Sequence, residues 1–347
     1  MCSERLASLN VSSLVGRRVS ITGIIKDLAI KSTKNGADML SFNLVDNDVQ
    51  RGVVFFNLTP YMQEKMNKCM GKVVCVVVDV KPYDKGEDGV SCVMYDIEVD
   101  DTADINEFIP AVKNIAEYAE RANKYLTYCS GTVYGKIALQ LMQDNWSAMS
   151  TIPAGHSQHH DLKGGLLMHT VCVADNCMND YNTYSKVYGS GLINLPLLLC
   201  GALIHDIGKC FELAYDGVGG CDYTARAAIE SHTVTGIRLI ERVAAQLGCS
   251  DTDEVKELIH LVASHHDKLE WGAAVRPSSI EAIILSRADE KDAIVNKFSK
   301  KIRDIKVGEY TSEWSGGSQL SNYYRCMSED EARENVELLK YSAGEEG

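Results

Sequence analysis

The sequence lacks an apolar run long enough to cross a bilayer. Its most apolar stretch, residues 192–204, is interrupted by Asn194 and Pro196, whereas a membrane-spanning helix needs about 20 consecutive apolar residues. The first five residues, Met1 to Arg5, also lack an apolar signal core. We therefore expect a cytoplasmic protein with no membrane partner.

Paired cysteines and an excess of positive charge are missing as well. The twelve cysteines form no C-x-x-C pair, so a structural zinc knuckle is not expected, and a chain of this length without a signal core suggests a reducing compartment. The formal net charge of -13 argues against a nucleic-acid binder that relies on bulk electrostatics. It leaves room for a local basic groove, and for an enzyme whose metal ions supply the positive charge that phosphates seek.

The first hundred residues carry a β pattern. Between the expected strands lie a turn-prone segment at 31–36, a short helix at 59–70 with Pro60 in its first turn, and a polar turn at 83–89. The expected strands are residues 19–25, 40–45, 52–57, 72–80 and 90–99. Three strands, a helix and two strands is the order of an OB-fold β-barrel.

An OB fold commonly binds single-stranded nucleic acid through strand faces and loops. Because Phe55 and Phe56 are neighbours on one strand, they should face opposite sides, and only one of them can stack on a base. The candidate contacts are Lys31, Lys34, Phe55, Lys81 and Lys85. The alternative roles are core packing for the aromatic ring and a solvated rim for each lysine.

The rest of the chain is expected to be helical. The acidic run at residues 96–104 predicts a linker, Pro110 is expected to open a helix through Tyr128, and helical periodicity then dominates to about residue 305. The tail is expected to be a flexible segment followed by one amphipathic helix at 329–339. The predicted parts are an OB-fold domain at 1–104, a helical linker at 105–150, an all-α domain at 151–305 and a tail at 306–347.

Histidines and aspartates gather in the helical part. His205 and Asp206 directly follow the apolar stretch 197–204, so the end of a buried helix presents an imidazole and a carboxylate together. This mixed set suits manganese, iron or zinc better than calcium or magnesium. His169 and Asp289 can complete the ligands of a first ion.

A second ion needs imidazoles of its own, which His232, His265 and His266 can provide while Asp206 bridges both ions. Two such ions, about 3.5–4 Å apart, polarise a phosphoryl oxygen, activate water and stabilise the leaving oxygen of a phosphodiester. Lys209 is placed one short turn beyond the His-Asp pair, where it can contact a phosphate or pair with a helix C-terminus. The catalytic candidates are Asp206, Lys209 and His232.

Each histidine taken alone is more often a hydrogen-bonded core or surface group than a ligand, so the prediction rests on the joint pattern. His260 lies about one and a half helical turns before His265 and is expected to pack or to support the ligands. His156, His159 and His160 precede the first ligand in a glycine-containing loop. We expect them to grip a substrate phosphate, with structuring of the loop as the alternative.

These residues resemble the HD superfamily of metal phosphohydrolases and, within it, the YhaM family of bacterial 3'-to-5' exoribonucleases. The resemblance covers most of the chain, including the order of a barrel before an HD domain. Its motifs are residues 153–160 (PAGHSQHH), 164–170 (GGLLMHT), 201–209 (GALIHDIGK) and 264–272 (SHHDKLEWG), followed by Glu281-Ala282, Ala288-Asp289 and Asp292-Ala293.

The resemblance implies hydrolysis of single-stranded RNA, or of DNA, one nucleotide at a time from the 3' end. It implies two divalent metal ions, with Mn²⁺ as the first choice and Fe²⁺, Co²⁺, Zn²⁺ or Ni²⁺ as alternatives for the same ligands. It also assigns residues 151–305 to an HD phosphohydrolase domain and gives the barrel the role of holding the nucleic-acid strand. It is compatible with a homo-oligomer.

Two alternatives stay open. One is an HD phosphohydrolase of small nucleotides or cyclic dinucleotides, against which the fused barrel favours a polymer. The other is a non-catalytic nucleic-acid-binding module, against which the intact set of ligands argues, because buried charge without metal costs stability.

Overall fold

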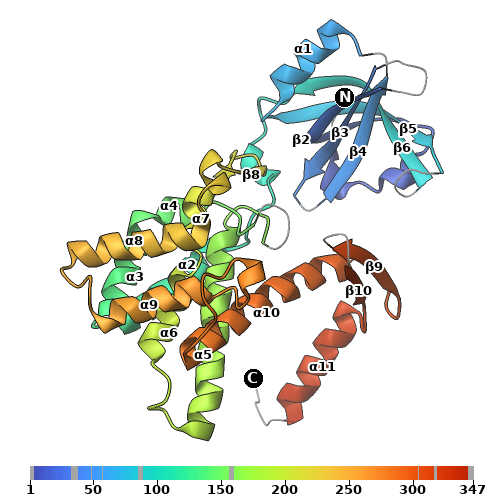
Figure 1. The fold of residues 1–347 in the computed structure, drawn as a ribbon. Helices are drawn as coiled ribbons and strands as arrows, with labels where there is room; N and C mark the ends of the chain where they lie inside the picture. The colour runs from blue at the N-terminus through green and yellow to red at the C-terminus, as the bar shows by residue number, and fades with distance from the viewer. Residues whose placement is uncertain are drawn as a thin grey trace.

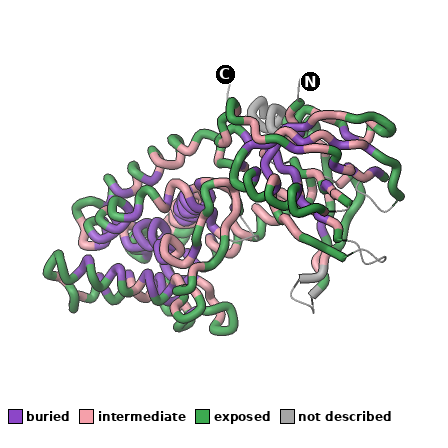
Figure 2. The backbone as a smooth tube through the Cα atoms, turned by 90° about the horizontal axis from the view of Figure 1, so that it is seen from above, coloured by how far each residue is buried: buried purple, intermediate pink, exposed green. Residues whose placement is uncertain are grey.

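A β-barrel is followed by a body of helices and then by a C-terminal hairpin and helix (Figure 1). Buried residues gather inside the barrel and between the helices (Figure 2). In the described residues, no helix combines the length and the apolar character that a bilayer crossing needs. The computed structural model describes residues 4–32, 38–47, 49–56, 58–84, 89–155, 160–303, 305–315 and 319–342.

The barrel closes because its fourth strand pairs with its first. Its strands are β2 (Arg18–Ser32), β3 (Asp38–Asp46), β4 (Val49–Phe56), β5 (Val73–Pro82) and β6 (Val90–Val99). Neighbours run β2-β3-β4-β6-β5, and β5 returns to β2. β4 and β6 are parallel and the other neighbours antiparallel. With α1 (Pro60–Cys69) between β4 and β5, this is the predicted OB-fold barrel.

Alternating valines in β5 fill the barrel core: Val74, Val76 and Val78 are fully buried, as the two-residue period of a strand predicts. The 15-residue strand β2 bends at a bulge between Lys26 and Ala29, where Asp27 has a positive φ of 53°. A bulge increases the local twist and redirects the neighbouring side chains. The short strand β1 (Glu4–Arg5) pairs in parallel with β2.

The segment after β6 packs against the barrel and bonds to the residues just before α5, and the run predicted as a linker at 96–104 begins inside β6. Residues 96–99 belong to β6, and Phe108 and Ile109 are buried in one cluster with Ile24 and Val73 of the barrel. The acidic composition of the run gave no sign of the apolar pair that follows it.

Pro110 does not open a helix, which corrects a second expectation. Its carbonyl accepts a hydrogen bond from the Lys163 N–H (2.9 Å), and the Val112 N–H donates to the Lys163 carbonyl (2.9 Å). These bonds satisfy the backbone in an extended conformation. Asn114, with a positive φ of 57°, then precedes the first residue of α2.

The helical body is built around α6, which is apolar on all sides and packs against α2, α3, α5, α9 and α10. Its helices are α2 (Ile115–Cys129), α3 (Val133–Asp144), α4 (Trp146–Met149), α5 (Gly165–Tyr188), α6 (Leu195–Ile204), α7 (Lys209–Glu212), α8 (His232–Gln246), α9 (Asp253–Ser264) and α10 (Ile280–Ile302). This helical body agrees with the predicted fold class of a barrel followed by a helical HD domain.

Two hairpins were not predicted. One interrupts the helical body between α7 and α8, and the other lies in the tail before α11 (Glu329–Ser342), where one helix was expected. Their strands are β7 (Leu213–Tyr215), β8 (Cys221–Tyr223), β9 (Tyr310–Ser315) and β10 (Gln319–Tyr324). Tyr323 of the second hairpin is fully buried, with its ring 4.7 Å from that of Phe298 on α10.

Candidate metal centre

The seven predicted ligands come together between α5, α6, α8, α9 and α10. They sit on α5 and α10, at the first residue of α8, and at the ends of α6 and α9. In chain order they are His169, His205, Asp206, His232, His265, His266 and Asp289. Four of them, His169, His205, Asp206 and His265, are buried.

One group of ligands consists of His169, His205 and Asp289, whose ligand atoms all lie within 4.8 Å of one another. His169 Nε2 is 3.1 Å from Asp289 Oδ1. His169 Nε2 and His205 Nε2 are each 3.4 Å from Asp206 Oδ2. We call His169, His205 and Asp289 the first group.

The second group consists of His232, His265 and His266, and their ligand atoms also lie within 4.8 Å of one another. His232 Nε2 and His265 Nε2 are 3.6 Å and 3.7 Å from Asp206 Oδ1. The two oxygens of Asp206 therefore face different groups, so one carboxylate spans both.

Carboxylates hold the outer nitrogens of two of these rings. His169 Nδ1 lies 2.7 Å from Asp292 Oδ2, and His232 Nδ1 lies 2.6 Å from Glu212 Oε2. In each pair the imidazole N–H donates to the carboxylate, which turns the Nε2 atom toward Asp206. Metal-binding histidines are held by such carboxylates in many proteins.

Backbone carbonyls hold two further rings. His205 Nδ1 donates to the Ala202 carbonyl (2.8 Å), and His265 Nδ1 donates to the Val262 carbonyl (2.7 Å). Both acceptors lie in the last turn of their helices, α6 and α9, where backbone carbonyls lack helical partners. The same bonds leave each Nε2 as an acceptor that points away from its helix.

The centre brings buried hydrogen-bond acceptors together, which is what a cation requires. Both oxygens of Asp206 and Nε2 of His265 are buried, and His265 Nε2 has no hydrogen-bond partner in the described part of the chain. His232 Nε2 and His266 Nε2 lie 3.0 Å apart. Imidazole nitrogens and carboxylate oxygens together are the donor set of transition-metal ions, so these residues fit divalent cations.

The low pKa values of two imidazoles in the second group favour cation binding. Burial, together with the charges of His266 and His205, holds the pKa of His265 well below its ordinary value. Burial and the charge of His232 also lower the pKa of His266. Since a metal binds the neutral imidazole, both rings are in the binding form near neutral pH.

The aspartates are ionised. Burial would raise the pKa of Asp289, but the hydrogen bond from His169 and the charge of His205 hold it far below its usual range. Burial would lower the pKa of His169, but hydrogen bonds to Asp206, Asp289 and Asp292 hold it well above its ordinary value. Without metal, His169 thus keeps a proton that a cation would displace.

Lys209 lies inside the centre rather than at its rim. Its Nζ atom is 2.7 Å from Asp206 Oδ2, with the side chain only 12% exposed. Burial would lower the pKa of Lys209, but the charge of Asp206 raises it, so this ammonium stays charged beside the bridging carboxylate.

His160 does not face solvent, which corrects the expectation that it grips a phosphate. It is 2% exposed, its Nε2 lies 2.7 Å from Asp292 Oδ2, and its backbone N–H donates to Asn296 Oδ1 (2.9 Å). His160 therefore supports Asp292, which in turn holds His169. His156 and His159 lie outside the described residues.

The barrel carries a groove of about 350 Å³ lined by Lys31, Arg51 and Tyr83 among others. Phe55 is half-buried and packs against the barrel core, the alternative role given for it, whereas Phe56 is 46% exposed and faces outward. Lys81 is exposed at the end of β5. Lys34 and Lys85 lie outside the described residues.

Sequence reasoning missed two carboxylates that hold ligands, Asp292 and Glu212. Asp292 stands three residues after Asp289 on α10, and residues three apart share a helix face, so this spacing was a usable signal. Glu212 has no such signal, because it reaches His232 across the β7-β8 hairpin that was not predicted.

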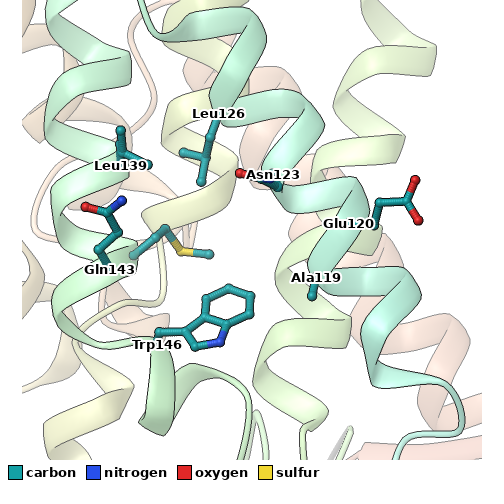
Figure 3. A pocket seen from close by; sticks show the side chains of 8 residues that line it. Ala119, Glu120, Asn123, Leu126, Leu139, Gln143 and Trp146 are labelled. Atoms are coloured by element: carbon teal, nitrogen blue, oxygen red, sulfur yellow. The ribbon is translucent and has the colours of Figure 1, made fainter.

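A second pocket lies away from the predicted ligands, between α2 and α3 (Figure 3). Its volume is about 490 Å³, and Leu126, Leu139, Met142 and Trp146 form its apolar part. None of the seven predicted ligands lines it, so this pocket is separate from the candidate metal centre.

Comparison with known families agrees with the geometry. The family model described as "HD domain" matches residues 167–294, a range that contains all seven candidate ligands. The HD domain belongs to a superfamily of metal-dependent phosphohydrolases. The match therefore indicates a phosphohydrolase that depends on divalent metal.

Solved structures show only distant similarity. RecG bound to a three-way DNA junction is 23% identical, with a TM-score of 0.24, and the match covers 32% of this chain and 14% of that chain. The mitochondrial single-stranded DNA binding protein Rim1 from S. cerevisiae is 20% identical, with a TM-score of 0.20 and coverage of 24% and 94%. The OB domain of Ta0387 from Thermoplasma acidophilum is 14% identical, with a TM-score of 0.20 and coverage of 32% and 94%.

Proposed function

We propose that this protein is a phosphodiesterase that uses two divalent ions, one at each group of ligands, to hydrolyse single-stranded nucleic acid. The observation that carries the proposal is the position of Asp206, whose buried carboxylate turns Oδ2 toward His169 (3.4 Å) and Oδ1 toward His232 (3.6 Å), so that its two oxygens face the two groups. A carboxylate in this position can bridge two cations.

Two divalent ions at this site would polarise a phosphoryl oxygen and stabilise the charge that develops on the leaving oxygen. The chain's own groups prepare the site. Asp292 and Glu212 fix the rings of His169 and His232, while Lys209 keeps a positive charge beside Asp206. Mn²⁺ is the ion we favour, because mixed imidazole and carboxylate ligands suit it.

The proposed substrate is single-stranded RNA, or DNA, shortened from its 3' end. The resemblance of the motifs at 153–170 and 264–272 to the YhaM exoribonucleases supports this direction and substrate. The barrel supports a polymer, because its groove offers Lys31 and Arg51 for phosphates and Tyr83 for a base.

The loop that follows the second group in the sequence also suits a nucleotide. The loop that follows His266 carries Trp271, which is 47% exposed, and the Lys268 ammonium lies 3.6 Å from the centre of its indole ring. An exposed indole stacks on any base, and a nearby ammonium attracts phosphate. Arg287 donates to Asp267 of this loop (3.0 Å), so the loop contacts the helix α10 that carries Asp289.

The test is to incubate the purified protein with Mn²⁺ and single-stranded RNA labelled at its 5' end. We expect a ladder that shortens to small labelled oligomers, because removal from the 3' end keeps the label on the polymer. His205→Ala and Asp206→Ala should abolish the ladder, while His260→Gln, at a histidine that accepts from the Ser278 N–H, should leave it unchanged.

Two outcomes would contradict the proposal. Immediate release of the labelled mononucleotide would show the opposite direction, and turnover of a cyclic dinucleotide without any RNA ladder would favour the small-nucleotide phosphohydrolase. A chain that binds RNA but hydrolyses none of these substrates with Mn²⁺ would be a binding module.

A further inference from the structure

A lysine of the barrel contacts the helical body that carries the candidate metal centre. Lys26 Nζ donates to the Gly219 carbonyl at 2.7 Å, a partly buried bond between residues 193 positions apart. Lys26 stands at the bulge of β2, beside Asp27, which has a positive φ. Bulges redirect side chains, and this one directs the lysine to the helical body.

The acceptor of that bond lies in an ordered turn. The turn joins β7 to β8, and Asp216 Oδ1 accepts from the backbone N–H groups of Val218 and Gly220, both at 2.8 Å. Gly219 has a φ of +91°, and a Cβ atom there would lie 2.8 Å from Lys26 Nζ. The bonds of Asp216 order the turn that presents this carbonyl, and the positive φ of Gly219 favours glycine there.

The other end of the hairpin reaches the metal centre. The Thr224 N–H, just after β8, donates to the Glu212 carbonyl (2.9 Å), just before β7. The Thr224 hydroxyl donates to the Phe211 carbonyl (2.9 Å). The Glu212 carboxylate holds His232 Nδ1 at 2.6 Å. A continuous set of hydrogen bonds thus joins the barrel to one ligand of the second group.

We infer that Lys26 is a positioning residue for the metal centre: by anchoring the β7-β8 hairpin, it keeps Glu212 in place to hold the ring of His232. This inference rests on the proposed function, because it assigns a support to one of its two ion sites. The effect is local to the second group. The first group is held through Asp292 on α10 instead.

This assignment gives the barrel two roles. Asp27, the neighbour of Lys26, lines the groove proposed to bind the nucleic acid. Its carboxylate accepts a hydrogen bond from Asn43 Nδ2 (2.9 Å). The groove and the anchor therefore meet at the same bulge, so the element that would bind the polymer is also the element that supports His232.

The experiment measures metal affinity directly, by calorimetric titration of the full chain with Mn²⁺ after removal of metal. Lys26→Met keeps the aliphatic stem and removes the donor. We expect about tenfold weaker binding of one of the two ions, since supports of metal ligands typically contribute about 10–100-fold to affinity. Lys26→Arg retains a donor and should restore most of the loss.

Two further variants sharpen the test. Gly219→Ala approaches the same bond from the hairpin and should produce the same selective loss. Lys72→Met, an exposed barrel lysine next to β5, is the matched control and should change neither affinity. In a Glu212→Gln background, Lys26→Met should add nothing, because residues that act in one chain of contacts are not additive.

The outcomes separate the two proposals. Two ions bound with unchanged affinity in Lys26→Met, equal losses at both sites, or an additive double variant would each overturn the positioning role alone. A wild-type chain that binds fewer than two ions would overturn the two-ion centre, and the positioning role with it.

Discussion

Asp292 accepts from two histidines at once, and this makes it the most sharply defined support of the centre. His160 and His169 each lie 2.7 Å from the same oxygen, Oδ2. Burial would raise the pKa of Asp292, but these two hydrogen bonds hold the pKa well below its usual range. The carboxylate is therefore bound in its charged form.

This shift predicts an acid-sensitive contribution to stability. Because the folded pKa lies below the unfolded value of about 3.9, the contribution is complete above about pH 4 and is lost as the pH falls toward the folded pKa. In metal-free protein, Asp292→Asn should cost about 2 kcal/mol near neutral pH and should reduce the loss of stability below pH 4. Urea unfolding at a series of pH values measures both effects.

Glu290→Gln, two residues earlier on α10, is the control, because Glu290 pairs with the exposed Arg287. Its unfolding curves should follow the wild type throughout. Wild-type and Asp292→Asn curves that run parallel from pH 6 to pH 2 would show that Asp292 is not the group responsible.

Single residues of the candidate site could be predicted where residue types that are rare in this chain gather in short motifs. Histidine is scarce in this chain, so His205-Asp206 and His265-His266 stood out, and the fold brings them together. Burial was not visible. His160 therefore looked like a loop residue open to substrate, although its side chain is buried, and nothing in the sequence showed that Phe55 is half-buried against the barrel core.

At the scale of elements, the close approach of the α6–α7 turn to α8 positions His232. A Cβ atom on Gly208 would lie 2.0 Å from the His232 carbonyl oxygen, a contact that no side chain rotation can relieve. The glycine has an ordinary negative φ of -64°, so space and not backbone conformation requires it. The turn carrying Asp206 and the start of α8 can meet only without a side chain here.

Gly208→Ala should therefore destabilise the fold by about 3 kcal/mol, the upper end for an overpacked core, and weaken metal binding by moving His232. Thermal unfolding and Mn²⁺ titration measure the two effects. Gly131→Ala is the matched control, because its Cβ would meet nothing within 4 Å. Equal melting temperatures for the two variants would refute the packing argument.

Long strands and helices were predictable from the sequence, whereas the shortest strands were not. The barrel strands and the long helices have enough residues to show a period of 2 or 3.6. β7 and β8 have three residues each, too few for any period, and the hairpin they form was missed. The hairpin makes contacts at both ends, including the bond from Lys26, which lies far away in the sequence.

At the scale of the whole molecule, the order of barrel and helical body followed from the sequence, but the joint between them did not. Phe108 and Ile109 follow the acidic run that was predicted as a linker, and they are buried against Ile24 and Val73. The next residues pair with Lys163, just before α5. A pattern confined to one segment cannot show which distant surfaces will cover it.

The barrel groove supplies a test of its role for the intact protein. Gly52 lines the groove, and a Cβ there would meet only Asn43 Oδ1, at 3.9 Å, so a larger side chain would fill the space. Gly52→Leu should raise the KM for single-stranded RNA about tenfold, within the range of losing one stacked base. Hydrolysis of bis-p-nitrophenyl phosphate should stay unchanged.

Gly52→Ala is the graded control, because a methyl group fits the available space and should leave both activities near the wild type. Parallel losses on RNA and on the small diester in Gly52→Leu would mean that the substitution disturbs the metal centre. The groove would then have no separate part in holding the polymer.

His205 and His265 end their helices through Nδ1 while they present Nε2 to Asp206. A relative that had lost hydrolysis would still gain helix stability from a histidine at either place. Asp289 lies within α10, and His266 one residue beyond the cap of α9. In a survey of chains with this architecture, survival of His205 or His265 alone is therefore weak evidence of activity, and replacement of Asp289 or His266 is the better mark of an inactive member.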